Sequence, residues 1–216
     1  MDIFALVLMS LIYLAELIFA FFEIERFRKI FKPLCLLALI FYLAMMKLDN
    51  IYIYGALFFG WIGDIFLIFK KERKILVLIG ILSFLVGHIF YIITFVNLLS
   101  YDIPVIAIII TIALGLLSPL VPYKMCYRNT KFFTAPGGFY GYVLFVELIV
   151  AILLAIDQKT MYSNLILAGN MLFITSDIVL TVSMFFKDFK RRDFYIMGTY
   201  LAAQTLMSIG LFFMIK

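Results

Sequence analysis

The stretch Gly60 to Leu67, GWIGDIFL, lies inside an apolar run that extends from Ile51 to Phe69. A helix of about 20 apolar residues is long enough to cross the hydrocarbon core of a bilayer, which is about 30 Å thick. An ionisable side chain within such a helix is costly and is by default a candidate for function. Asp64 therefore raises two questions, namely how many such helices the chain contains and what this carboxyl group does among them.

The composition of the chain is that of a multi-pass membrane protein. Of its 216 residues, 66% are hydrophobic and 14% are charged, with a mean hydropathy of +1.16, whereas soluble domains have roughly 45–50% apolar residues. The first apolar segment lacks the basic leader and cleavage site of a signal peptide, so we expect it to be retained. Apolar runs predict eight spanning helices at residues 3–22, 31–46, 51–69, 75–99, 104–122, 137–156, 163–186 and 194–215. We therefore expect residues 1–216 to form one all-α transmembrane bundle.

The basic residues predict the orientation of this bundle. All of the 18 lysines and arginines except Lys47, Lys159 and Lys216 lie in the first, third, fifth and seventh connections between the predicted helices. The positive-inside rule places these connections in the cytoplasm and both termini on the other side. The net charge of +5 is then explained by topology and by contact with anionic lipids, and we expect no nucleic-acid partner. Short basic connections are typical of a bacterial inner-membrane protein.

Two further features have ordinary structural explanations. Cys35 and Cys126 have neither the spacing of a metal site nor that of a disulfide framework, so we expect packing roles for them and predict no metal and no cofactor. Pro33 follows Lys32 at the predicted start of the second helix, and proline suits a first helical turn.

The predicted helices contain a short list of ionisable and polar residues. The ionisable ones are Glu16, Asp64, His88, Glu147 and Asp177, with Asn170, Ser176, Tyr140, Tyr200 and Gln204 in support. Each of them, taken alone, is also explained as a hydrogen-bonded contact between helices. At 1.5 Å per residue, Asp64 and Asp177 lie about 8 and 14 Å from the predicted cytoplasmic ends of their helices. His88 and Gln204 lie about 20 and 15 Å from the same side, which is compatible with one cavity open to the cytoplasm.

Small residues accompany the polar ones on single helix faces. Spacings of three and four place on common faces Gly60, Gly63, Asp64 and Leu67, then Gly80, Phe84, Gly87, His88 and Tyr91, and then Gly169, Phe173, Ser176, Asp177 and Leu180. The glycines have two interpretations, close helix packing or clearance around the carboxyl groups. The similarity of Gly63-Asp64-Ile65 to Ser176-Asp177-Ile178 also suggests a duplicated four-helix unit.

These motifs resemble those of the lysoplasmalogenases, the YhhN-like family of integral membrane hydrolases. The resemblance covers about residues 32–204 and is carried by Lys32-Pro33, G-x-x-G-D-x-x-L at Gly60 to Leu67, F-x-x-G-H-x-x-Y at Phe84 to Tyr91, G-x-x-x-F-x-x-S-D-x-x-L at Gly169 to Leu180, and Y-x-x-x-Q at Tyr200 to Gln204. It implies cleavage of the vinyl-ether bond of a lysoplasmalogen, giving a fatty aldehyde and glycerophosphocholine or glycerophosphoethanolamine. It also implies that Asp64 and Asp177 are the catalytic pair.

The residue types suit this chemistry. A vinyl ether is hydrolysed by protonation of its β-carbon and capture of the oxocarbenium ion by water, so one carboxyl acts as acid and the other stabilises the cation, as in glycoside hydrolysis. We expect His88 and Gln204 to orient water or the ether oxygen and Tyr140 to contact the head group. Lys32 has two interpretations, a ligand of the lipid phosphate or a boundary residue that extends to the membrane surface. The other supporting residues are Tyr91, Asn170, Ser176 and Tyr200.

Other functions are compatible with buried carboxyl groups. A proton-coupled or small-molecule transporter would also carry them inside the membrane. An intramembrane aspartyl protease uses two aspartates, but its usual Y-D and G-x-G-D motifs are not matched at Asp64 and Asp177. A non-catalytic structural protein is disfavoured by the cost of burying the charges. The expected partners are a lysophospholipid substrate and the bilayer, and the oligomeric state is left open.

Overall fold

The computed structural model describes residues 2–68, 74–101, 104–117, 134–185 and 187–216. Within these ranges the chain is all-helical, without strands, as the sequence predicts. Its eight helices are α1 (Ile3–Phe21), α2 (Glu25–Met45), α3 (Ile51–Ile68), α4 (Lys74–Asn97), α5 (Val105–Leu117), α7 (Thr134–Gln158), α8 (Met161–Phe185) and α9 (Arg192–Ile215). Some residues of the sequence predictions lie outside the described ranges. They are Phe69, Cys126, residues 118–122 of the fifth segment, residue 186, and the basic residues Lys70, Lys71, Arg73, Lys124, Arg128 and Lys131 of the third and fifth connections.

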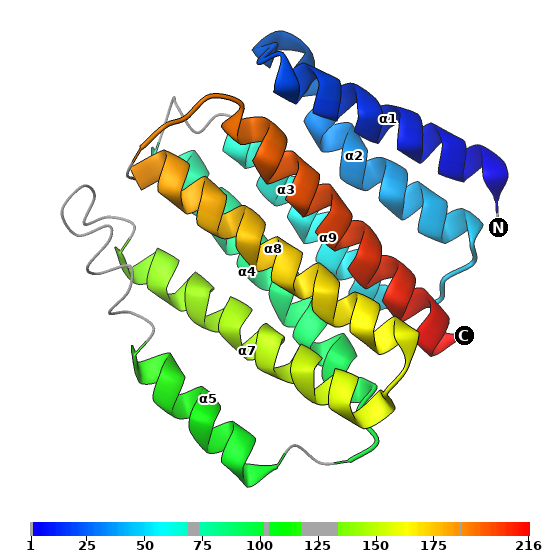
Figure 1. The fold of residues 1–216 in the computed structure, drawn as a ribbon, viewed down its shortest axis with the longest axis vertical. Helices are drawn as coiled ribbons and strands as arrows, with labels where there is room; N and C mark the ends of the chain where they lie inside the picture. The colour runs from blue at the N-terminus through cyan, green and yellow to red at the C-terminus, as the bar shows by residue number, and fades with distance from the viewer. Residues whose placement is uncertain (1, 69–73, 102–103, 118–133, 186) are drawn as a thin grey trace.

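The helices lie side by side in one bundle (Figure 1). Two tightly packed pairs, α3 with α4 and α8 with α9, form its centre, and α7 packs against both α4 and α8. Helix α1 packs on α2 and α9 at one edge, and α5 lies beside α7 at the other. Both termini lie at the same end of the bundle (Figure 1).

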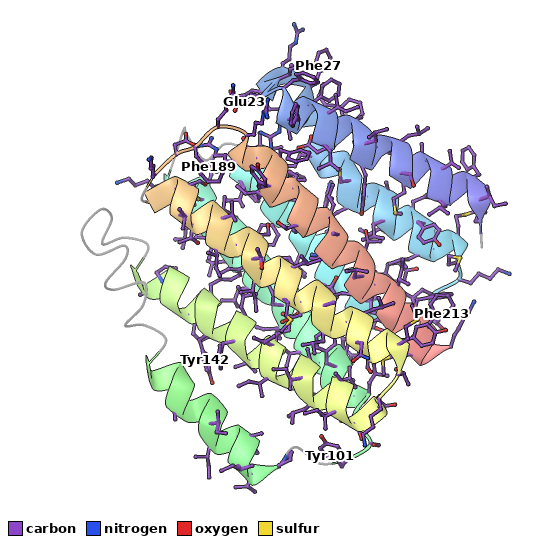
Figure 2. All side chains as sticks on the ribbon, viewed as in Figure 1. Glu23, Phe27, Tyr101, Tyr142, Phe189 and Phe213 are labelled. Carbon is purple, nitrogen blue, oxygen red and sulfur yellow. The ribbon has the colours of Figure 1, made fainter. Side chains whose placement is uncertain are left out.

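The outer surface is apolar, as expected for contact with lipid. Large hydrophobic side chains are exposed around the bundle, among them Phe27 and Phe213, which project outward in Figure 2. In the described part of the chain, six helices are long and apolar enough to span a membrane, namely α1, α3, α4, α7, α8 and α9. Helix α2 carries a charged first third, and α5 has only 13 described residues. The chain is thus a multi-pass membrane protein, while its orientation stays a prediction.

The start of the second helix differs from the prediction. Helix α2 begins at Glu25, so Pro33 lies in its interior and not in its first turn. Hydropathy places the start too late because the first turns are charged, and an acidic residue such as Glu25 is favourable at a helix N-terminus. Proline has no backbone N–H and cannot donate to the carbonyl group of Lys29. The helix continues through this position and holds Lys32 toward the interior of the bundle.

The glycines of α3 and α4 allow close helix packing. A Cβ atom on Gly87 would lie 2.9 Å from the carbonyl oxygen of Ala56, and one on Gly63 would lie 2.6 Å from the ring of Phe84. Real Cβ atoms do not approach their neighbours so closely, because hard-sphere repulsion is steep in a densely packed interior. The packing interpretation of these glycines is therefore confirmed, and Gly63 also makes room for an aromatic ring beside Asp64.

Candidate active site

One cavity of about 140 Å³ contains both aspartates. It lies at the end of the bundle where α2 and α9 begin and α3 ends, and Asp64 of α3 and Asp177 of α8 both contribute to its lining. Its apolar wall consists of Leu67, Ile68, Phe84, Phe173, Leu180, Ile196 and Met197. Its charged rim consists of Glu25, Arg28, Lys29, Arg192 and Asp193. The predicted juxtaposition of the two carboxyl groups in one cavity is thus observed.

Asp64 is buried and both of its oxygens have partners. The Nζ of Lys32 lies 3.2 Å from Oδ1, and the hydroxyl group of Tyr200 donates to Oδ2 at 2.9 Å. A charge inside a low-dielectric interior is tolerated when it is paired and hydrogen-bonded in this way. Lys32 therefore does not extend to the boundary as a free cation. Its ammonium group lies inside the cavity, on the carboxyl group itself.

Asp177 has different surroundings. Its side chain is half-buried, and the hydroxyl group of Tyr140 donates to its Oδ2. Within the described part of the chain, no cation pairs with Asp177. Among the described residues, Asp64 thus has a cation and a phenol as partners, whereas Asp177 has a phenol alone.

A buried polar cluster lies behind Tyr140. Its hydroxyl oxygen is 3.5 Å from Nε2 of His88, and Nδ1 of His88 is 2.5 Å from Oε2 of Glu147. The other oxygen of Glu147 accepts a hydrogen bond of 2.8 Å from the side-chain amide of Asn170. His88, Glu147 and Asn170 are almost fully inaccessible to solvent. Among the described residues, the hydrogen bonds of the cluster reach the cavity through Tyr140 and the half-buried Asp177.

The predicted supporting residues divide into two groups. Lys32, Ser176 and Tyr200 line the cavity, although the hydroxyl group of Ser176 donates to the carbonyl oxygen of Ile196 at 3.0 Å. The remaining ones are set back from the lining, namely His88, Tyr91, Tyr140, Asn170 and Gln204. Gln204 accepts a hydrogen bond of 2.6 Å from the hydroxyl group of Tyr91. In this arrangement His88 and Gln204 do not reach a ligand in the cavity directly, and Tyr140 contacts Asp177 rather than the rim.

Comparison with known proteins gives one match. The model of the YhhN family matches residues 27–211. This range includes every motif named above and excludes the first helix. The chain belongs to the YhhN family. This is the family of lysoplasmalogenases, and membership indicates a hydrolase of the membrane. No curated protein and no solved structure matches the chain.

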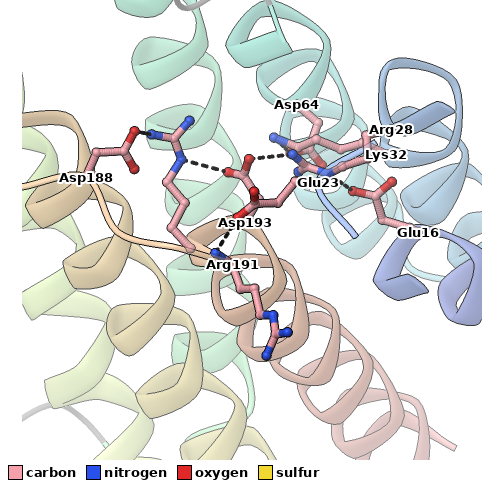
Figure 3. A network of polar contacts seen from close by, with 9 residues as sticks. Glu16, Glu23, Arg28, Lys32, Asp64, Asp188, Arg191 and Asp193 are labelled. Carbon is pink, nitrogen blue, oxygen red and sulfur yellow. Dashed lines mark hydrogen bonds and ion pairs between the residues drawn. The ribbon is translucent and has the colours of Figure 1, made fainter. Parts of the chain in front are cut away.

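The rim of this YhhN-family protein is an ion-pair network that sequence reasoning missed. Arg28 lies between Glu16 of α1, at 3.2 Å, and Asp193 of α9, at 2.5 Å (Figure 3). Arg192 contacts Asp193 and Asp188. From the sequence alone these arginines indicate only the orientation of the bundle. The spacing of Arg28 and Lys32, one helical turn apart, would have placed both on one face.

The YhhN-family cavity offers carboxyl, phenol and ammonium groups for chemistry. Across the described residues, no group of three or more His, Cys, Asp and Glu side chains is arranged to hold a metal ion. Cys35 is buried, and its thiol donates to the carbonyl oxygen of Phe31 at 3.3 Å, so its packing role is confirmed. The arrangement is suited to proton transfer beside an apolar ligand.

Proposed function

We propose that this protein hydrolyses the vinyl-ether bond of lysoplasmalogens, with Asp64 and Asp177 as the catalytic pair. The observation that carries the proposal is that Asp64 and Asp177, which have unlike partners, line one cavity with an apolar wall and a charged rim that includes Arg28, Lys29 and Arg192. Membership in the YhhN family supports it. The products would be a fatty aldehyde and glycerophosphocholine or glycerophosphoethanolamine.

The lining suits the two ends of such a lipid. Leucine, isoleucine, methionine and phenylalanine side chains form the wall and would contact an alkenyl chain. Arg28, Lys29 and Arg192 at the rim would attract the phosphate group, for which guanidinium and ammonium groups are the usual ligands in proteins. The vinyl-ether bond lies between these two parts of the lipid, and so would lie near the carboxyl groups.

The proposed reaction needs both carboxyl groups. One gives a proton to the β-carbon of the vinyl ether, which creates an oxocarbenium ion. The other, as a carboxylate, stabilises this cation and accepts a proton from the attacking water. The hemiacetal then collapses to aldehyde and alcohol, so that one water is consumed and no net proton is gained or lost.

The decisive experiment measures aldehyde release by the purified protein in detergent micelles supplied with a 1-alkenyl lysophospholipid. We expect Asp64→Asn and Asp177→Asn each to lower kcat about a thousand-fold, because each removes a proton-transfer group. Asp49→Asn is the matched control, since Asp49 is exposed in the connection between α2 and α3. Substantial activity in either cavity variant, with thermal unfolding showing a folded protein, would contradict the pair.

A parallel assay tests the bond type. An ester lysophospholipid of the same chain length and head group should release no fatty acid if the chemistry is restricted to vinyl ethers. If the wild-type protein releases neither aldehyde nor fatty acid, the hydrolase function is wrong. The buried carboxyl groups would then be better explained as proton sites of a transporter.

A further inference from the structure

We propose that Glu147, His88 and Tyr140 form a proton relay that ends on Asp177, which makes Asp177 the acid of the catalytic pair. The inference rests on the proposed function for its chemical step, but the relay itself is a property of the resting protein. Its members come from three helices, with His88 on α4, Tyr140 and Glu147 on α7, and Asp177 on α8.

The helical register brings these groups into line. Tyr140 and Glu147 are seven residues apart, which is close to two turns of α7, so both lie on the face that packs against α4. His88 lies between them, with Nδ1 2.5 Å from Glu147 and Nε2 3.5 Å from the hydroxyl oxygen of Tyr140. The second distance is at the outer limit for a hydrogen bond, and such contacts often shorten once substrate is bound.

The same heavy-atom positions accept two arrangements of protons. When Asp177 is ionised, Tyr140 donates to it, and an imidazolium at His88 donates from Nε2 to the hydroxyl oxygen of Tyr140. When Asp177 is protonated, it donates to Tyr140, and Tyr140 donates to Nε2 of a neutral His88. The two arrangements differ by the transfer of one proton along the chain, and no side chain has to change its place.

Glu147 is the positioning residue of this relay. Its two oxygens are bound by His88 and by Asn170, at 2.5 and 2.8 Å, in a site that solvent does not reach. A carboxylate hydrogen-bonded to Nδ1 keeps a proton on that nitrogen and directs Nε2 toward Tyr140. It also offsets the positive charge of an imidazolium, which would otherwise be costly in an apolar interior.

Asp64 has no comparable chain of hydrogen bonds among the residues that the structure describes. Its oxygens are bound by the Lys32 ammonium group and by Tyr200. The fixed cation suits a side chain that is a carboxylate in the resting protein and faces the oxocarbenium ion when that ion forms. The unlike partners of the two aspartates therefore divide their roles, with proton supply at Asp177 and charge stabilisation at Asp64.

The proton balance closes over one turnover. The Nε2 proton of His88 passes to the oxygen of Tyr140 as the hydroxyl proton passes to Asp177, and Asp177 then protonates the β-carbon. Water adds to the oxocarbenium ion and gives a proton to Asp64. As the hemiacetal collapses, Asp64 returns this proton to the leaving alcohol oxygen. The hemiacetal hydroxyl proton goes to Asp177 and back along the relay to His88.

Other titratable and charged groups surround the relay and enter any pH dependence. Asp64, Lys32, Arg28 and Arg192 line the same cavity as Asp177. Tyr91 lies beside His88 on α4, with ring centroids 6.3 Å apart. Tyr200 of α9 lies beyond Phe173, whose ring separates it from His88. The pH profile of kcat therefore needs a second measurement that reports the protonation of His88 directly.

The chain supplies such a signal because it contains a single histidine. Labelling with ¹⁵N-imidazole histidine gives one Nδ1 and one Nε2 resonance in micelles without substrate. We expect a hydrogen-bonded Nδ1–H throughout and an Nε2 protonation midpoint that shifts in Glu147→Gln and in Asp177→Asn. Asp49→Asn should leave both resonances unchanged. An Nε2 midpoint that is the same in wild type, Glu147→Gln and Asp177→Asn would overturn the relay.

Kinetics give the second arm. Glu147→Gln keeps the size of the side chain and an oxygen that can accept from Nδ1, but it removes the negative charge. We therefore expect kcat to fall 10- to 100-fold, KM to stay within about two-fold, and the pH profile of kcat to change. Tyr140→Phe interrupts the relay without altering Glu147, so the double variant should be no slower than Tyr140→Phe alone. Additive losses, or an unchanged kcat and pH profile in Glu147→Gln, would refute the relay. A wild type that releases no aldehyde would refute the proposed function, and the resonances of His88 would still decide whether the relay exists.

Discussion

The ammonium group of Lys32 lies 3.2 Å from Oδ1 of Asp64, so a cation of α2 and a carboxyl group of α3 meet inside the cavity. The side chains are only 15% and 3% exposed. Breaking such a pair on one side leaves a charge that is neither solvated nor neutralised. The relationship makes Lys32 part of the site and gives it a measurable effect on stability.

Replacement of Lys32 by methionine should destabilise the protein and reduce turnover. Loss of one partner of a buried ion pair costs about 3–5 kcal/mol, and Asp64 would lose its fixed positive neighbour. The free energy of unfolding and kcat are the measurements, with Lys32→Arg as the variant that keeps the charge. If Lys32→Met is as stable and active as wild type, the pair contributes nothing.

Tyr200→Phe should lower kcat while the protein stays folded. The phenol donates to Asp64 at 2.9 Å, and a hydrogen bond to a charged group contributes about 1.5–3 kcal/mol, which corresponds to a loss of roughly 10- to 100-fold. Tyr195→Phe is the control, because Tyr195 lies on the same helix and is 53% exposed. Equal rates in the two variants would show that the hydroxyl group of Tyr200 is not used.

The Arg28 contacts should hold α1 to the rest of the bundle. Arg28→Met would leave Glu16, which is fully buried, without its cation, so we expect a loss of about 3 kcal/mol or more. Glu16→Gln should cost less, because no buried charge is left behind. The two variants are compared by their free energies of unfolding and by the rate of limited proteolysis near Glu23. A larger loss in Glu16→Gln than in Arg28→Met would contradict this account.

Two glycine-to-alanine substitutions should have opposite effects. At Gly87 the new methyl group would meet the carbonyl oxygen of Ala56 at 2.9 Å, so α3 and α4 must separate, at a cost of about 1–3 kcal/mol. At Gly141 an added Cβ atom has no neighbour within 4 Å among the described residues, and alanine should stabilise α7 by roughly 0.5–1 kcal/mol. Unfolding measurements on both variants test the packing, and equal effects would argue against it.

Reporter fusions at the two termini should both report the non-cytoplasmic side of a bacterial inner membrane. The expectation rests on the basic connections and on the location of both termini at one end of the bundle (Figure 1). A cytoplasmic signal from both fusions would mean that the orientation is the reverse of the predicted one. The cavity would then open on the opposite face of the membrane.

The sequence predicts the helices well because length and apolarity determine what can cross a bilayer. The prediction fails at the start of α2, because the hydropathy of the charged segment Glu25 to Lys32 is that of a connection. In the structure these charges are helical and find partners on α1, α3 and α9. Such partners depend on how helices are placed around one another, and one helix's periodicity does not contain that information.

The candidate site shows the same division. The similar frames of Asp64 and Asp177 on parallel segments predict that the two carboxyl groups share a cavity. The partners are not predictable in this way, since His88 pairs with Glu147 and Lys32 with Asp64 across helix interfaces. Whether the two aspartate motifs derive from a duplicated four-helix unit stays a prediction.

The groups around the cavity come from separate parts of the chain. Lys32 lies on α2, the carboxyl groups on α3 and α8, and the phenols that bind them on α7 and α9. If the protein is the hydrolase that we propose, turnover requires that almost the whole polypeptide has been inserted and assembled. Aldehyde release in intact membranes would then report quantitatively how much of the protein is fully assembled. The same assay after detergent extraction would identify variants that stay assembled.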